Sequence, residues 1–126
     1  MATYYNLIVY KNSYKLALIV RKMSLKLPHE MADVAKQIRR SSKSIPDNIA
    51  EGYARNKSTK DKINFLRTSL GSNDETIGHL NFIRDCNSYK IEIITRLIEA
   101  YEVNGKRLNR LIQYNHYQKQ DNKKTR

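Results

Sequence analysis

The sequence predicts an all-α fold, an antiparallel up-and-down four-helix bundle formed by a single domain. Apolar residues recur at steps of three and four in four segments of the 126-residue chain, which is the period of helices that bury one face. No segment alternates with a period of two over a useful length, so no sheet is expected. The connections between the segments are short, and short connections make consecutive helices antiparallel neighbours.

The first two helices are predicted on either side of Pro28. The first carries an apolar stripe through residues 7–23 and ends before this proline, because the residue that precedes a proline disfavours the α region. The second runs from about Asp33 towards Tyr53 and contains Pro46. A proline lacks the amide hydrogen and crowds the preceding turn, so a kink is expected there. Two short helices in place of one kinked helix are the alternative.

The last two helices are predicted on either side of a turn near Asn87. The third begins after Ser58 or Thr59, either of which can cap its first turn, and Asn87 tolerates the left-handed conformation found at helix C-termini. Ser88 is expected to cap the fourth helix. Gly105 interrupts that helix at a cost of about 1 kcal/mol relative to alanine, and it allows a neighbouring helix to approach closely.

The domain organisation and the cellular location follow from composition. The bundle is assigned to residues 1–114, and residues 115–126 are expected to form a disordered C-terminal tail because they offer little to bury. Cys86 is the one cysteine, so no disulfide can form within the chain and a reducing cytoplasm is the expected location. Neither a secretory signal nor a stretch of about 20 apolar residues is present, so no membrane association is expected.

The net charge is the observation that is most informative about partners. Lys and Arg number 24 against 12 Asp and Glu, which gives a formal charge of +12. A field of this size favours polyanions, so nucleic acid bound through its phosphates is the expected partner. Solvated helix faces without a specific ligand are the alternative. The candidate nucleic-acid-binding residues are Arg39, Arg40, Lys43, Arg55, Lys57, Lys60 and Lys62.

No catalytic or metal-binding constellation is recognised, so an enzyme is not expected. The four glycines are isolated and form no phosphate-binding loop. The three histidines are scattered. Glu75 and His79, four residues apart on the third helix, are too few ligands for a metal site. The sequence therefore predicts neither a metal nor a cofactor.

Polar residues of the second and third helices are expected to form a buried structural network. Asn48 and Glu51 share a face of the second helix and lie beside predicted core residues, and buried polar groups need partners. The candidate partners on the third helix are Arg67, Ser69, Ser72 and Glu75, of which Arg67 and Ser72 are assigned to the network. Replacing Glu51 by alanine should then cost a few kcal/mol. An active carboxylate at Glu51 is the alternative interpretation.

Five short motifs occur in the order and spacing of a known protein family. They are residues 37–40 (QIRR), 44–52 (SIPDNIAEG), 65–67 (FLR), 70–72 (LGS) and 108–112 (LNRLI). With these motifs the chain resembles, over roughly residues 5 to 113, the four-helix-bundle proteins encoded in intervening sequences of bacterial 23S rRNA genes. The chain departs from that family at residues 73–76 (NDET), which predict a more polar surface on the third helix.

The resemblance implies a bundle that assembles as a ring, commonly a pentamer, with no established enzymatic activity. Relatives include the accessory variability proteins of diversity-generating retroelements, which are basic pentameric bundles that bind nucleic acid and a reverse transcriptase. The chain is therefore expected to be a homopentamer that binds nucleic acid, RNA rather than DNA. An adaptor that binds a protein partner such as a reverse transcriptase is the alternative.

Apolar residues outside the predicted stripes also indicate self-assembly, because exposed apolar patches usually mark interfaces. A heterologous contact that repeats from copy to copy can close into a ring. The aliphatic residues of this kind are Val9, Ile19, Leu25, Ile93 and Val103, and the tyrosines are Tyr4, Tyr5, Tyr53, Tyr89, Tyr114 and Tyr117.

Overall fold

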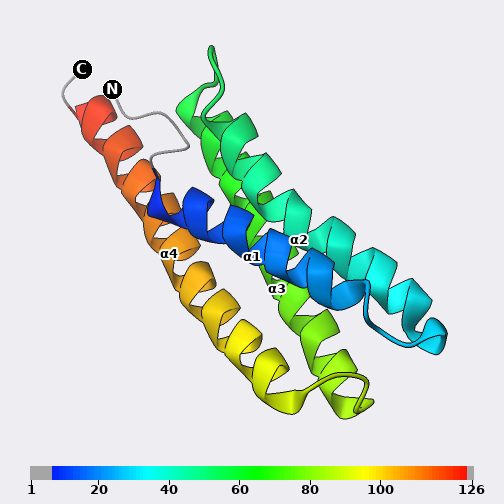
Figure 1. The fold of residues 1–126 in the computed structure, drawn as a ribbon. Coiled ribbons are helices and arrows are strands. Elements are labelled where there is room, and N and C mark those ends of the chain that lie inside the picture. The colour runs from blue at the N-terminus through cyan, green and yellow to red at the C-terminus, as the bar shows by residue number, and fades with distance from the viewer. Residues whose placement is uncertain (1–6, 125–126) are drawn as a thin grey trace.

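The computed structural model describes residues 7–124 and, within them, the side chains of all but residues 119 and 121–124. Four α-helices and one short 3₁₀ helix follow one another, and these residues contain no strand. The elements are α1 (Ile8–Ser24), η2 (His29–Met31), α2 (Ala32–Gly52), α3 (Thr59–Asp85) and α4 (Ile91–Lys124) (Figure 1). The prediction of an all-α fold with four helices is confirmed.

The helices pack as neighbours in the order of the chain. α2 lies along α3 and α3 lies along α4, whereas α1 lies mainly on α2 and touches α4 less (Figure 1). Oγ of Ser41 lies 2.8 Å from Oγ1 of Thr76, and Ser69 donates a hydrogen bond of 2.8 Å to the carbonyl oxygen of Ile45. Higher residue numbers on α2 thus meet lower numbers on α3. The limited contact between α1 and α4 leaves grooves between these two helices.

The core is formed by apolar stripes of all four helices. Burying these side chains removes apolar surface from water, which is the main favourable term in folding. The fully buried apolar residues are Val20 of α1, Ile38, Ile45 and Ile49 of α2, Leu66, Leu80 and Ile83 of α3, and Ile94, Tyr101 and Leu108 of α4.

The apolar residues predicted to lie outside the stripes differ in how far they are exposed. Val9 belongs to the core with 5% exposure, so its prediction is wrong: it faces inward one turn before the buried Ser13. The exposed ones are Ile19, Leu25, Val103, Tyr114 and Tyr117, the half-buried ones are Ile93, Tyr53 and Tyr89, and Tyr4 and Tyr5 lie outside the described residues.

The ends of α3 confirm two predictions, and the start of α4 corrects one. Ser58 is the N-cap of α3, and its hydroxyl oxygen accepts a hydrogen bond of 3.1 Å from the amide of Asp61. Asn87 adopts the left-handed conformation with φ of 51°. Ser88 does not cap α4, which begins only at Ile91, because its hydroxyl donates to a carbonyl oxygen of the preceding connection at 3.4 Å.

α4 extends beyond the predicted start of the tail at residue 115. Asn115 is buried at 6% exposure, and its Nδ2 donates a hydrogen bond of 2.8 Å to the carbonyl oxygen of Leu111. One residue further, Nε2 of His116 lies 2.9 Å from Nη2 of Arg67 on α3. Residues 115–124 are helical. The segment predicted to be a disordered tail thus continues α4 as far as residue 124, and the contact of His116 with Arg67 connects its start to α3. Residues 125–126 lie outside the described residues.

Pro46 lies inside α2 and is buried. α2 is one helix from Ala32 to Gly52, so the alternative of two short helices is wrong. The missing amide of a proline leaves one carbonyl of the preceding turn without its helical donor. Helix α2 thus continues past Pro46 although it lacks one backbone hydrogen bond there.

Candidate nucleic-acid interface

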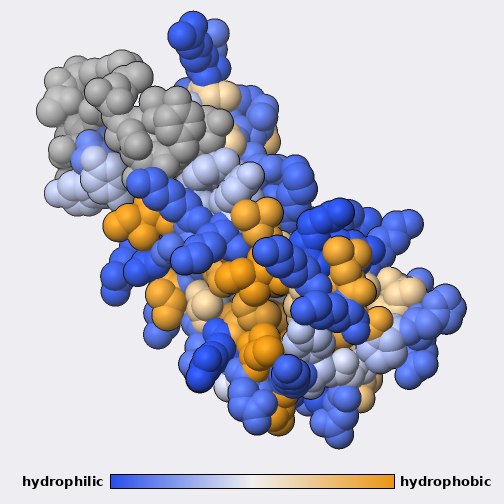
Figure 2. Space-filling view, viewed as in Figure 1, coloured by the Kyte–Doolittle hydropathy of each residue, from blue (hydrophilic) through white to orange (hydrophobic). Residues whose placement is uncertain are grey.

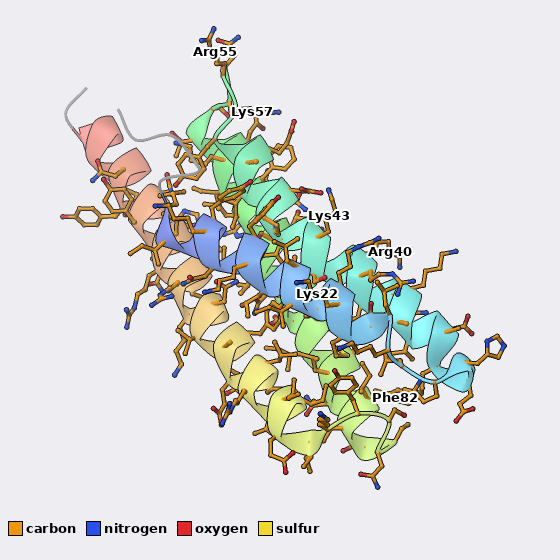
Figure 3. The ribbon with its side chains drawn as sticks, in the orientation of Figure 1. Lys22, Arg40, Lys43, Arg55, Lys57 and Phe82 are labelled. Carbon is orange, nitrogen blue, oxygen red and sulfur yellow. The ribbon has the colours of Figure 1, made fainter. Side chains whose placement is uncertain are left out.

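The seven predicted nucleic-acid-binding residues fall into two groups. The α2 group consists of Arg39, Arg40 and Lys43. The connection group consists of Arg55 and Lys57, between α2 and α3, with Lys60 and Lys62 in the first turn of α3. In Figure 3, Arg40 and Lys43 lie on α2, whereas Arg55 and Lys57 lie beyond the end of α2. The structure therefore separates the predicted residues along the length of the bundle.

The three cations of the α2 group differ in their surroundings. Arg40 is exposed. Arg39 is half-buried, and its Nη1 donates a hydrogen bond of 3.0 Å to the hydroxyl of Ser24. Lys43 forms an ion pair of 2.8 Å with Asp47 one turn away, and this hydrogen bond raises the pKa of Lys43 above its ordinary value. Arg40 is thus the member most available to an exposed phosphate.

The connection group is partly occupied by intramolecular contacts. The ammonium of Lys57 lies 3.4 Å from a carboxylate oxygen of Glu51 and 4.7 Å from the centre of the Phe65 ring. The ammonium of Lys62 lies 4.5 Å from the centre of the Tyr53 ring. Aromatic faces attract cations, so Lys57 and Lys62 are held against the protein. The exposed members of this group are Arg55 and Lys60.

The predicted polar network is only half present. Asn48 is half-buried and donates through Nδ2 to the carbonyl oxygen of Ser44 at 2.8 Å and to its hydroxyl at 2.9 Å. The Ser44 hydroxyl in turn lies 2.8 Å from that of Ser72. Asn48 and Ser72 are therefore connected through a residue that the sequence analysis did not include.

Glu51 and Arg67 do not join this network, and the prediction that Glu51 is buried is wrong. The side chain of Glu51 is 57% exposed. It lies in the last turn of α2, where water solvates the carboxylate and Lys57 approaches it. Arg67 is exposed on α3 and contacts His116. Burying an ion pair would cost desolvation energy that these exposed positions avoid.

A buried polar cluster that the sequence analysis missed lies between α1, α3 and α4. Asn104 donates through Nδ2 to the hydroxyl of Ser13 at 2.9 Å and to Oδ1 of Asn73 at 3.1 Å. Asn73 donates through its own Nδ2 to the carbonyl oxygen of Tyr101 at 2.9 Å. Asn73 and Thr76 have no exposed surface, so the prediction that residues 73–76 make the surface of the third helix more polar is wrong for both. Both residues lie at helical spacing from the core residue Leu80, and this spacing could have predicted their burial from the sequence.

Two atoms of this cluster lack a hydrogen-bond partner among the described residues. They are the hydroxyl oxygen of Tyr101 and Oδ1 of Asn104. Burial raises the pKa of Tyr101 well above its ordinary value, because the apolar surroundings disfavour the phenolate. An unpaired buried polar atom costs stability, so this cluster sets the packing of three helices at an energetic cost.

The described part of the chain holds few groups that could form another kind of site. No group of three or more His, Cys, Asp and Glu residues there could hold a metal ion. Glu75 and His79 do face one another, at 3.3 Å, but as a pair alone. None of the helices there has the length and apolar character needed to cross a membrane. The chemistry that the described surface offers most clearly is that of exposed cations.

The comparisons with known proteins agree with this fold. No curated protein matches the chain. A crystal structure from Bacteroides thetaiotaomicron, described as that of a protein with unknown function from the S23 ribosomal protein family, matches with a TM-score of 0.76 and 27% sequence identity. The match covers 84% of this chain and 96% of that one. The family model of the 23S rRNA-intervening sequence protein matches residues 5–110, so the chain belongs to the 23S rRNA-intervening sequence protein family.

Proposed function

We propose that this protein is a non-enzymatic, cytoplasmic nucleic-acid-binding protein, which binds RNA in preference to DNA through phosphate contacts and works as a homopentamer. The observation that carries the proposal is the unbalanced positive charge of +12. Among the described residues, carboxylates pair with lysine or arginine only at Lys43–Asp47 and Lys57–Glu51. The other described lysines and arginines have no carboxylate partner among the described residues, so the exposed ones are left to solvent or to an anionic partner.

Phosphate neutralisation is the mechanism that this distribution supports. Arg40, Arg55 and Lys60 are exposed and without a carboxylate partner among the described residues. A guanidinium matches two phosphate oxygens with parallel hydrogen bonds. Contacts of this kind position a nucleic acid without reading its bases. Their binding energy comes largely from released counterions, so it falls steeply with salt.

Fluorescence anisotropy tests the proposal with labelled RNA and DNA of matched sequence between about 50 and 200 mM salt. Affinity for RNA is expected to exceed that for DNA, and the logarithm of the affinity should fall linearly with the logarithm of the salt concentration. Arg40→Gln and Arg55→Gln should each reduce the salt slope by about one. Arg96→Gln, on α4 and outside both groups, serves as the matched control. Binding that is absent at low salt, or unchanged by salt, contradicts the proposal.

Self-assembly is supported by apolar side chains left exposed where α1 passes α4. Ile8, Ile19 and Val103 are 64%, 40% and 46% exposed. They line grooves between the two helices, and Figure 2 shows apolar residues on the face that α1 crosses. Light scattering at moderate salt should give about five times the chain mass of 14.8 kDa. A monomer mass at micromolar concentration contradicts the assembly.

The same exposed apolar side chains support one alternative, an adaptor for a protein partner. Because the family's relatives are expected to include retroelement accessory proteins, a reverse transcriptase is the partner to test. Capture of a reverse transcriptase that survives nuclease treatment favours the adaptor. Loss of the captured protein after nuclease treatment favours the nucleic-acid-binding function.

Two finer features of the fold belong to the same proposal. We propose an antiparallel up-and-down arrangement, which the opposite order of partners along α2 and α3 supports, as at Ser41–Thr76 and Ser69–Ile45. We also propose a kink of α2 at Pro46, which the missing amide supports. A crystal structure of the free protein tests both.

A further inference from the structure

A groove of about 310 Å³ lies between α1 and α2 and combines apolar with cationic side chains. Such a volume is at the lower end of the range of small-molecule sites. Pro46 and Ser42 are its buried members, whereas Tyr14 and Leu18 are 52% and 50% exposed. Its lining residues are Tyr14, Ala17, Leu18, Arg21, Arg39, Ser42, Lys43, Pro46 and Asp47.

The charges of the groove leave two guanidinium groups for an anion. Asp47 is its one carboxylate, and Lys43 already neutralises it at 2.8 Å. Arg21 and Arg39 have no carboxylate partner among the described residues. Arg39 is held through Nη1 by the hydroxyl of Ser24, so its guanidinium is positioned while its other N–H groups remain to donate. A phosphate can accept such hydrogen bonds from both arginines.

The apolar part of the groove suits a flat ring. The exposed ring of Tyr14, the side chain of Leu18 and the buried ring of Pro46 line the same groove. Nucleic-acid bases stack on aromatic and apolar surfaces largely without regard to base identity. Each nucleotide carries such a flat face beside a phosphate, whereas the carboxylates of an acidic peptide carry no flat ring. The pairing of apolar surface with two arginines therefore favours a nucleotide.

We propose that this groove binds one nucleotide unit of a single-stranded nucleic acid, with its phosphate at Arg21 and Arg39 and its base against Tyr14, Leu18 and Pro46. The inference rests on the proposed nucleic-acid-binding function and deepens it by naming the form of nucleic acid. A base within a duplex is stacked and paired, and flipping it out costs free energy. A single strand has no base pair to break, so it offers its bases at a lower cost.

Anisotropy with three labelled oligonucleotides of about 12 nucleotides tests the inference. They are a single-stranded RNA, the same strand with abasic residues, and an RNA duplex. The single strand is expected to bind roughly tenfold more tightly than the abasic strand. Tyr14→Leu should remove most of this difference, because it removes the stacking ring. Tyr117→Leu, at an exposed tyrosine on α4 outside the groove, should leave it intact.

The phosphate contact is tested with a second pair of variants. Arg21→Gln should weaken single-strand binding about fivefold, whereas Lys22→Gln, its exposed neighbour outside the groove, should change it less than twofold. Photo-crosslinking of RNA that contains 4-thiouridine to the wild-type protein is independent of variant folding. The crosslinked peptide should include Tyr14.

The outcomes separate this inference from the proposed function. Failure of every oligonucleotide to bind contradicts both. If binding depends on salt but is equally tight for the single strand, the abasic strand and the duplex, and is unchanged by Tyr14→Leu, the inference about the groove is wrong while the proposed function stands. If poly-glutamate competes as strongly as RNA, the groove is a site for an acidic peptide. If AMP saturates the groove and a longer strand binds no more tightly, it is a site for a free nucleotide. Either result contradicts the inference. If Tyr14→Leu changes the mass of the assembly in light scattering, the groove is a contact between copies of the chain, and the inference is wrong in that case too.

Discussion

Asn73 of α3 and Asn104 of α4 share a hydrogen bond of 3.1 Å inside the bundle, where both side chains are fully buried. The Nδ2 of Asn104 also donates to Ser13 of α1 at 2.9 Å. One amide therefore connects three helices. Since a buried polar group is costly without its partner, this connection favours the register in which all three side chains meet.

Asn73→Ala should destabilise the protein by about 2–4 kcal/mol, because it removes two buried hydrogen bonds and leaves a cavity. Urea denaturation should show a lower midpoint with an unchanged slope. Asp74→Ala, its exposed neighbour, is the control and should stay within about 0.5 kcal/mol of wild type. A wild-type midpoint for Asn73→Ala would mean that the buried cluster contributes nothing to stability.

Tyr101→Phe should stabilise the protein by about 1 kcal/mol at neutral pH. The Tyr101 hydroxyl is buried without a hydrogen-bond partner among the described residues, so its removal ends a desolvation cost while the ring keeps its packing. Tyr117→Phe, at an exposed position, should leave stability unchanged. Destabilisation of Tyr101→Phe in urea would show that the hydroxyl has a partner after all.

Alkaline pH should destabilise the wild-type protein more than Tyr101→Phe. In the unfolded chain the phenol loses its proton near pH 10, but in the fold burial raises the pKa of Tyr101 above that value. Below pH 10 the phenol is protonated in both states and adds no pH dependence, whereas above pH 10 the unfolded state loses the proton first, so stability falls as the pH rises towards the folded-state pKa. Thermal unfolding in steps above pH 9 should show a shallower decline for the variant. Parallel declines would contradict the assignment.

Glu51→Ala should change stability by less than about 0.5 kcal/mol. This outcome is opposite to the expectation from sequence, because the carboxylate is 57% exposed and its ion pair with Lys57 spans 3.4 Å. Added salt should not widen the difference from wild type, since screening weakens exposed pairs. A loss of several kcal/mol in urea denaturation would show that Glu51 is buried in the native state.

Gly78→Ala and Gly105→Ala should have opposite effects. A Cβ at Gly78 meets no atom within 4 Å, so the substitution should stabilise α3 by about 0.5–1 kcal/mol through helix propensity. A Cβ at Gly105 would lie 3.1 Å from Nδ2 of Asn73, a group held in place by its hydrogen bonds. Crowding should cost Gly105→Ala about 2 kcal/mol, which outweighs the helix-propensity gain of about 1 kcal/mol, so this variant should be less stable than wild type. Equal melting temperatures of the two variants would contradict the close approach at Gly105.

Much of the fold could be predicted from local properties of the chain. Helix periodicity places apolar side chains on one face whatever lies opposite, so the four helices could be predicted. The cap at Ser58 and the left-handed Asn87 depend on each residue's own side chain and backbone. The candidate cations could be named from sequence as well, but not that Lys57 and Lys62 lie against aromatic rings.

The sequence by itself determined which residues share a helix face, and only the tertiary structure decided which faces are covered. Glu51 and Asn73 are both polar and both lie beside apolar residues, yet Glu51 is exposed and Asn73 is buried. The difference arises because Glu51 lies in the last turn of α2, open to water, whereas Asn73 lies in the middle of α3 and faces Tyr101 and Asn104 of α4. Burial of a polar group depends on a partner from another helix, and no local pattern encodes where that partner lies.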